Sequence, residues 1–251
     1  MIGAALGLGI SVLGGTVPGT GILGSSAAAA RIVRIGISDL KAGTVVEGTD
    51  IRKNGLSAYF TSSPISDSVF ERMYGKSYKE DCIVPREDLR YLKVLYCGSD
   101  GRSYVGELVC HKDISQDLLE IFRELYDNFY PIEKMVLVDD YDGDDLKSAA
   151  DNNTSCFNYR LSSGDSGNLS RHALGKAIDI NPLYNPYQWI DKDGVTHYEP
   201  EEGCEYADRL GEFSYKIEED DLCVCLFQAH GFTWGGSWQN GEKDYMHFSI
   251  R

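Results

Sequence analysis

The chain has 251 residues, of which 42% are hydrophobic and 25% charged, and its formal net charge is −15 at pH 7. These values are typical of a soluble globular protein with one or two domains, long enough to bury a sizeable core. The negative charge argues against a nucleic-acid partner, because phosphate groups would be repelled.

The first 30 residues contain no charged side chain. Residues 1–17 are apolar and glycine-rich, and the alanines at 27–30 resemble the small-residue cleavage site of an export signal, although the usual positive charge at the start is missing. The many glycines and Pro18 weaken a membrane-spanning helix. We therefore predict that residues 1–30 are a signal-like or membrane-anchoring segment of an exported protein, with a disordered Gly/Ala leader as the alternative.

Residues 31–88 give the weakest pattern of the chain. Val45–Val46 and Ala58–Phe60 suggest short strands, and prolines and glycines interrupt the rest. We interpret this segment as an N-terminal extension that packs over the domain beginning at Leu89, and we assign it no function.

Seven cysteines are spread along the chain, and none forms a C-x-x-C pair of the kind that holds structural zinc. Disulfides in an exported protein and small buried side chains are equally compatible with this spacing.

The pattern becomes regular from Leu89. Leu89–Tyr96 alternates as a strand, the Gly98–Gly101 segment is a turn signal, and Tyr104–Cys110 returns as the second strand of a hairpin. A further strand is predicted at Lys134–Val138, and Leu222–Ala229 reads as a buried helix that ends at His230 and Gly231.

Between these strands the sequence predicts an amphipathic helix, with Asp113 or Ser115 as its cap and Pro131 beyond its end. Its apolar residues recur at three- and four-residue steps: Ile114, Leu118, Ile121, Phe122, Leu125 and Phe129.

A histidine and an aspartate lie close together in the segment 170–182. Gly175 permits a sharp bend after His172, because it has no Cβ. The following Ala177–Ile180 alternates like a short strand, so that Ile178 would face a core and Asp179 the opposite side. This arrangement suits a fixed metal ligand.

A second histidine, His247, follows Asp244 by three residues. Catalytic zinc takes three protein ligands of nitrogen and oxygen type and keeps one position open. We predict that His172, Asp179 and His247 are these ligands and that Asp244 is the general base. A three-residue step puts two side chains on opposite faces of a regular strand, so Asp244 must lie before a bend.

The combined pattern consists of Ser170, His172, Gly175, Ala177, Asp179, Asp244 and His247. This pattern resembles the M15 family of peptidoglycan zinc peptidases, which includes D-alanyl-D-alanine carboxypeptidases and phage endolysins that cut L-Ala-D-Glu bonds. The resemblance covers residues 89–251, which we take as the zinc peptidase domain. It implies an α+β fold, in which a small antiparallel sheet with flanking helices carries a zinc site in a cleft, as in the Hedgehog and DD-peptidase folds.

The resemblance also implies roles for neighbouring residues. Arg160 matches the family arginine that reaches the substrate carbonyl oxygen, where a guanidinium stabilises the developing oxyanion; a structural ion pair is the alternative. Ser170 is expected to bind a substrate carboxylate or carbonyl group. Trp234 and Trp238 are expected to line the cleft, although both could equally belong to the core.

These features together predict a secreted, monomeric zinc metallopeptidase, extracellular or associated with the cell envelope, that acts on the stem peptides of peptidoglycan. The resemblance favours a D-alanyl-D-alanine carboxypeptidase, with an L-Ala-D-Glu endopeptidase second. The Hedgehog signalling domain, which resembles this family in zinc ligation but works as a binding protein, leaves a non-catalytic, zinc-containing wall-binding protein as a third possibility.

Overall fold

The computed structural model describes residues 36–163 and 167–251. The predicted signal or anchor at residues 1–30 lies outside the described residues. The described residues all belong to one compact unit. Within the described ranges, each helix is too short or too polar to cross a membrane.

The strands are β1 (Val45–Val46), β2 (Thr61–Pro64), β3 (Leu89–Cys97), β4 (Ser103–His111), β5 (Ala177–Asp179), β6 (Tyr187–Ile190), β7 (Thr196–Glu199), β8 (Thr233–Trp234), β9 (Lys243–Asp244) and β10 (His247–Ser249). The α-helices are α1 (Gly48–Asn54), α2 (Asp67–Met73), α3 (Ser115–Asp127), α4 (Asp145–Ala150) and α5 (Leu222–Ala229). The α+β class predicted from the sequence is confirmed, and the sheets of the described residues are small and antiparallel.

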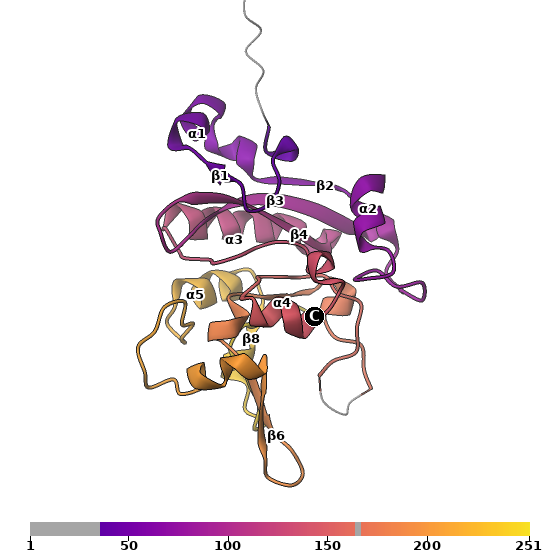
Figure 1. Cartoon of the computed structure of the whole chain (residues 1–251), viewed down its shortest axis with the longest axis vertical. Helices are drawn as coiled ribbons and strands as arrows, with labels where there is room; N and C mark the ends of the chain where they lie inside the picture. The colour runs from indigo at the N-terminus through magenta and orange to yellow at the C-terminus, as the bar shows by residue number, and fades with distance from the viewer. Residues whose placement is uncertain (1–35, 164–166) are drawn as a thin grey trace, which may run out of the picture. The chain divides into compact units, whose positions relative to one another are not determined.

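The central hairpin of the largest sheet is the predicted one. β3 and β4 pair along their whole length, from Leu89 opposite His111 to Cys97 opposite Ser103, and the strand order of the sheet is β1-β4-β3-β2. Helix α3 lies across one face of this sheet (Figure 1). Leu92, Val94 and Tyr96 point toward it, because alternate residues of a strand share a face.

Helix α3 is confirmed, but its predicted ends are wrong. The residue before its first turn, Ile114, makes no side-chain cap, and Ser115 Oγ instead donates to the carbonyl of Lys112 at 2.9 Å. At the other end Phe129 has a φ of 57° and is 76% exposed. This left-handed residue turns the chain away from the core before Pro131, so Phe129 cannot continue the apolar face of the helix.

Two predicted strands are also wrong. Lys134–Val138 forms no regular strand, because the side chain of Asn153 occupies the backbone groups of Val136: its Oδ1 accepts from Val136 N at 2.8 Å and its Nδ2 donates to Val136 O at 3.0 Å. Residues 56–59 form a 3-10 helix that buries Tyr59, and the strand begins only at Thr61.

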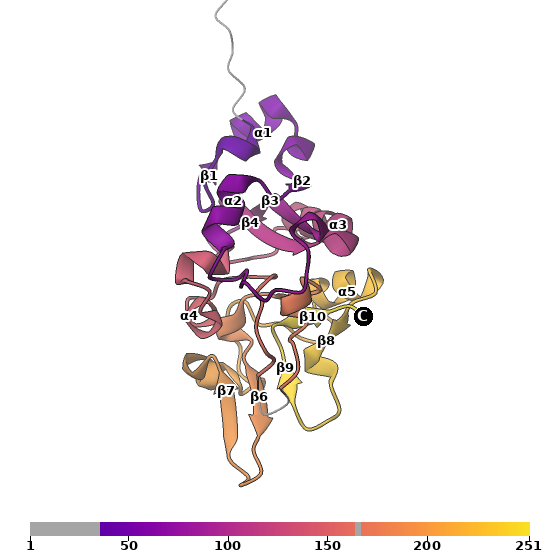
Figure 2. The same cartoon turned by 90° about the vertical axis from the view of Figure 1, so that its right-hand side faces the viewer.

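Two smaller sheets carry the site. One has the strand order β5-β10-β8, and the other, β7-β6-β9, is built on a hairpin that extends from the body of this unit (Figure 2). Helix α5 has the predicted bounds, with Gly231 in the left-handed region after it. Ile178, Phe227 and Phe248 belong to the same core as α3, so the site-bearing sheet shares one hydrophobic core with the large sheet.

Strands from both sides of residue 89 pair in the large sheet: β1 pairs with β4, and β2 pairs with β3. Residues 36–88 therefore supply both edge strands of the sheet rather than only covering it.

The sequence left open whether the cysteines form disulfides or are small buried side chains. Within the described residues all seven cysteines are free, and Cys97, Cys110, Cys156 and Cys223 are buried.

Candidate metal centre

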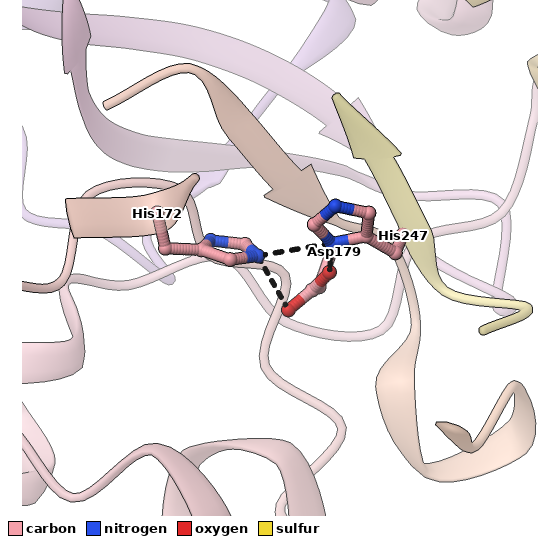
Figure 3. Close-up of side chains that lie close together, drawn as sticks. All are labelled: His172, Asp179 and His247. Carbon is pink, nitrogen blue, oxygen red and sulfur yellow. Dashed lines mark hydrogen bonds and ion pairs between the residues drawn. The ribbon is translucent and has the colours of Figure 1, made fainter. Parts of the chain in front are cut away.

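The three predicted ligands meet in one buried group (Figure 3). His172 opens a 3-10 helix, η6 (His172–Leu174), Asp179 ends β5, and His247 begins β10. One ligand atom from each side chain lies within 4.8 Å of the other two. Their elements come from two parts of the chain that are far apart in sequence.

The pairing of β5 with β10 places two of the ligands. Asp179 lies directly opposite His247, and Ile178 lies opposite Phe248. Ile178 and Phe248 are fully buried in the core, so the alternation of side chains turns Asp179 and His247 to the other face. The sequence predicted this orientation for Asp179.

Gly175 brings His172 to the same place. Its φ is +65°, and a Cβ there would lie 2.7 Å from the backbone nitrogen of His111. The Gly175 carbonyl accepts a hydrogen bond from that nitrogen at 2.8 Å. Only glycine suits both this backbone conformation and this close approach, which fixes the turn between His172 and β5.

A backbone carbonyl orients the ring of His172. Nδ1 of His172 lies 2.6 Å from the carbonyl oxygen of Cys156, which can only accept, so Nδ1 donates the hydrogen bond. Nε2 then faces the group, 3.2 Å from both Asp179 Oδ2 and His247 Nδ1. Metal-ligating histidines have this kind of partner on the other ring nitrogen. No sequence pattern points to this contact, because every residue has a carbonyl oxygen.

The charges of these three side chains influence one another. Burial alone would raise the pKa of Asp179, but His172 and His247 outweigh it and hold that pKa below its ordinary value. Burial lowers the pKa of His172, and the Asp179 carboxylate overcomes this effect and raises it. The carboxylate thus attracts positive charge into a buried site. Two imidazole nitrogens and one carboxylate oxygen are a donor set that zinc prefers, so these residues fit a zinc ion.

Asp244 lies beside this group. It ends β9, where it pairs with Tyr187 of β6, and a bend at residues 245–246 separates it from β10, as the three-residue step required. Its Oδ2 is 3.9 Å from His247 Nδ1, and its Oδ1 is buried with no hydrogen-bond partner among the described residues. Burial raises the pKa of Asp244 to about 8, because desolvation and Asp179 oppose its charge more than His247 and Arg160 favour it.

Arg160 lines the same cavity. It also forms an ion pair, which was the alternative to a catalytic role that the sequence allowed. Its Nη2 lies 2.6 Å from Asp145 Oδ2, in the first turn of α4, and its Nη1 donates to the carbonyl of Leu161 at 3.2 Å. Asp145 was missed by sequence reasoning, because nothing in its local pattern links it to Arg160.

A cavity of about 430 Å³ opens over the ligand group, and Asp244, Arg160, Ser170 and Trp238 also line it. Ser170 Oγ accepts from the backbone nitrogen of His172 at 3.2 Å and so supports the first turn of η6. The ring of Trp238 stands edge-on to that of His247, with 5.8 Å between the centroids.

Trp234 has a different position from Trp238. It is 4% exposed, belongs to the core, and donates from Nε1 to the carbonyl of Tyr245 at 2.8 Å. It is not among the residues that line the cavity. Of the two readings that the sequence allowed for the tryptophans, the structure places Trp234 in the core and Trp238 at the cavity.

Comparison with known proteins agrees with this geometry. The sequence model of a peptidase family of the M15 type, described as D-alanyl-D-alanine carboxypeptidase, matches residues 163–250. No curated protein and no solved structure matches the chain. The matched segment contains the three members of the ligand group and Asp244. Residues 163–250, the part of the chain that holds this group, are therefore similar to the M15 family of peptidases.

Proposed function

We propose that the protein is a zinc-dependent peptidase that hydrolyses peptidoglycan stem peptides and removes their terminal D-alanine. The observation that carries the proposal is the buried group of His172, Asp179 and His247 beside Asp244 in one cavity. The family description, D-alanyl-D-alanine carboxypeptidase, supports the choice of substrate. An L-Ala-D-Glu endopeptidase is the second candidate.

Different residues of the cavity bind the metal and transfer the proton. A bound zinc ion supplies a Lewis acid that makes water a nucleophile at neutral pH. His172, Asp179 and His247 would hold this ion, and the Cys156 carbonyl keeps the His172 ring in the required tautomer. Asp244, 3.9 Å from His247, removes a proton from the attacking water and delivers it to the leaving amine.

Arg160 acts on the substrate carbonyl. Its ion pair with Asp145 holds the guanidinium in the cavity wall. The positive charge of the guanidinium is therefore in place before the oxyanion forms. A positioned charge of this kind stabilises the tetrahedral state more than the ground state. The presence of both Asp244 and Arg160 in the cavity favours an enzyme over a non-catalytic wall-binding protein.

The proposal includes the setting of the reaction. The segment 1–30 directs export or anchors the chain to a membrane, and the protein works as a monomer outside the cell or at its envelope. These statements rest on the sequence pattern of residues 1–30 and on the substrate that the family description names.

The first test uses muropeptides with intact pentapeptide stems. We expect the purified protein to release one terminal alanine in a reaction that a chelator stops and added zinc restores, with products identified by mass. Cleavage between L-Ala and D-Glu would establish the endopeptidase instead. Zinc binding without cleavage would favour the binding protein.

A further inference from the structure

The cavity over the ligand group is rich in acidic side chains. Five acidic residues contribute to its wall: Asp145, Asp179, Glu199, Glu242 and Asp244. The protein as a whole carries a net charge of −15. A substrate that ends in a free carboxylate is repelled by such a wall, so its recognition requires a cation that is not already engaged.

Two arginines line this cavity, and they differ in their partners. Arg160 is committed to Asp145, at 2.6 Å, and has a side chain that is only 21% exposed. Arg171 is exposed, and its guanidinium makes no ion pair or hydrogen bond with the residues that the structure describes. The whole guanidinium of Arg171 is therefore free for a ligand, whereas Arg160 has only its Nε without a hydrogen-bond partner among the described residues.

The backbone of Arg171 is nevertheless held firmly. Its carbonyl accepts from the nitrogens of Leu174 and Lys176, both at 3.1 Å. It is the residue immediately before η6 and precedes the metal ligand His172. Arg171 thus lies in the wall of the cavity on a fixed backbone, next to the metal ligand His172.

We infer that Arg171 is a specificity-determining residue that binds the terminal carboxylate of the substrate. This inference rests on the proposed function and deepens it. A guanidinium and a carboxylate form a bidentate, charge-assisted pair. When the residue after the scissile bond is linked to a further residue through an amide, it has no free carboxylate for Arg171 to bind. Arg171 thereby makes the enzyme select chain ends over internal bonds.

The test compares an N-acylated D-Ala-D-Ala peptide with the same peptide as its C-terminal amide, using the zinc-loaded full chain. We expect the wild-type protein to prefer the acid. In Arg171→Gln, kcat/KM for the acid should fall about 10- to 100-fold, mainly through KM, because a hydrogen-bonded charge pair is lost. The amide should change less than about threefold, and Arg171→Lys should recover part of the loss for the acid.

Lys147→Gln is the matched control. It removes the same charge from a neighbouring cavity, where Lys147 Nζ pairs with Asp144 at 2.9 Å, and it should leave the preference for the acid unchanged. An equal loss for both substrates in Arg171→Gln would show a structural role and overturn the inference. A wild-type protein that cleaves acid and amide equally well would also overturn it.

Failure of the proposed function can be distinguished from failure of this inference by measuring binding. If the wild-type protein cleaves neither peptide, calorimetric titration with the same acid and amide still tests Arg171. Tighter binding of the acid that Arg171→Gln abolishes supports the inference without hydrolysis. Equal binding of acid and amide, or a preference that survives in the variant, rejects it.

Discussion

Asp244 has a buried carboxyl group beside one of the ligand histidines. It is buried, so its neutral form is favoured and its pKa rises to about 8, yet it lies 3.9 Å from a ligand histidine. A base must be able both to take and to release a proton near the working pH. The high pKa also acts on stability, because an unfolded Asp titrates near 4.

The first prediction concerns Asp244→Asn in chelator-treated protein. A group whose pKa is higher in the folded state stabilises the fold at low pH, and this contribution is lost as the pH rises from about 4 through about 8. The wild-type protein should therefore lose stability relative to Asp244→Asn over this range. Thermal denaturation should show a melting temperature for the variant that exceeds the wild type by several degrees more at pH 8 than at pH 5.

The same variant tests the role in hydrolysis. With zinc restored, Asp244→Asn should bind the metal stoichiometrically but lose about 100-fold or more in kcat, since general-base catalysis contributes about that much. Glu242→Gln, two residues away in the wall of the same cavity, is the control and should retain turnover. Wild-type turnover by Asp244→Asn would remove Asp244 from the mechanism.

At the scale of elements, the position of Asp244 depends on a glycine in the neighbouring turn. A Cβ on Gly235 would lie 2.5 Å from the carbonyl oxygen of Asp244 and 2.7 Å from its Cβ. The two-residue strand β9 is held on its other side by β6, where Asp244 pairs with Tyr187. Asp244 is thus fixed between a hairpin and a turn that has no room for a side chain.

We therefore predict that Gly235→Ala displaces Asp244 while it leaves the ligand group intact. Activity should fall at least tenfold, and the zinc content measured by mass spectrometry should stay at that of the wild type. Gly211→Ala is the control, because a Cβ there meets only the carbonyl oxygen of Asp208 at an ordinary 3.7 Å. A Gly235→Ala enzyme with full activity would show that β9 tolerates the shift.

The sequence predicts those elements whose apolar residues recur with the period of a strand or a helix. The β3–β4 hairpin, α3 and α5 are of this kind, and so is the placement of Asp179 by apolar neighbours on either side of it. The strand predicted at Lys134–Val138 is wrong, because the Asn153 side chain binds the backbone groups of Val136 in place of a neighbouring strand. The support of His172 by the Cys156 carbonyl, and of Arg160 by Asp145, depends on tertiary contacts that no local pattern encodes.

At the scale of the whole unit, residues 36–88 supply partners for two charged groups that are buried in the large sheet. Glu107 of β4 is buried, and Arg72 of α2 binds it at 2.6 and 3.0 Å. The ammonium of Lys93, buried in β3, donates to the carbonyls of Ile37 and Ser38 at 3.3 and 3.2 Å. Without residues 36–88 these two charges would lose most of their partners, which is costly for a buried group.

This arrangement predicts the outcome of truncation. A chain of residues 34–251 should unfold cooperatively with a melting temperature close to that of the full chain. A chain of residues 89–251, the peptidase domain expected from the resemblance, should show no cooperative transition in calorimetry and should aggregate. Independent folding of residues 89–251, with the same metal affinity as the longer chain, would show that residues 36–88 are dispensable.

The direct pairing of Asp179 with His247 has a consequence for when the protein can act. These residues lie 68 positions apart, and their strands meet as neighbours in one register, with Phe248 opposite Ile178. A chain that is stalled during synthesis, or cut by a protease, before residue 247 holds two of the three ligands and lacks the strand that closes the group. Hydrolytic activity should therefore appear only after β10 has been made and has docked.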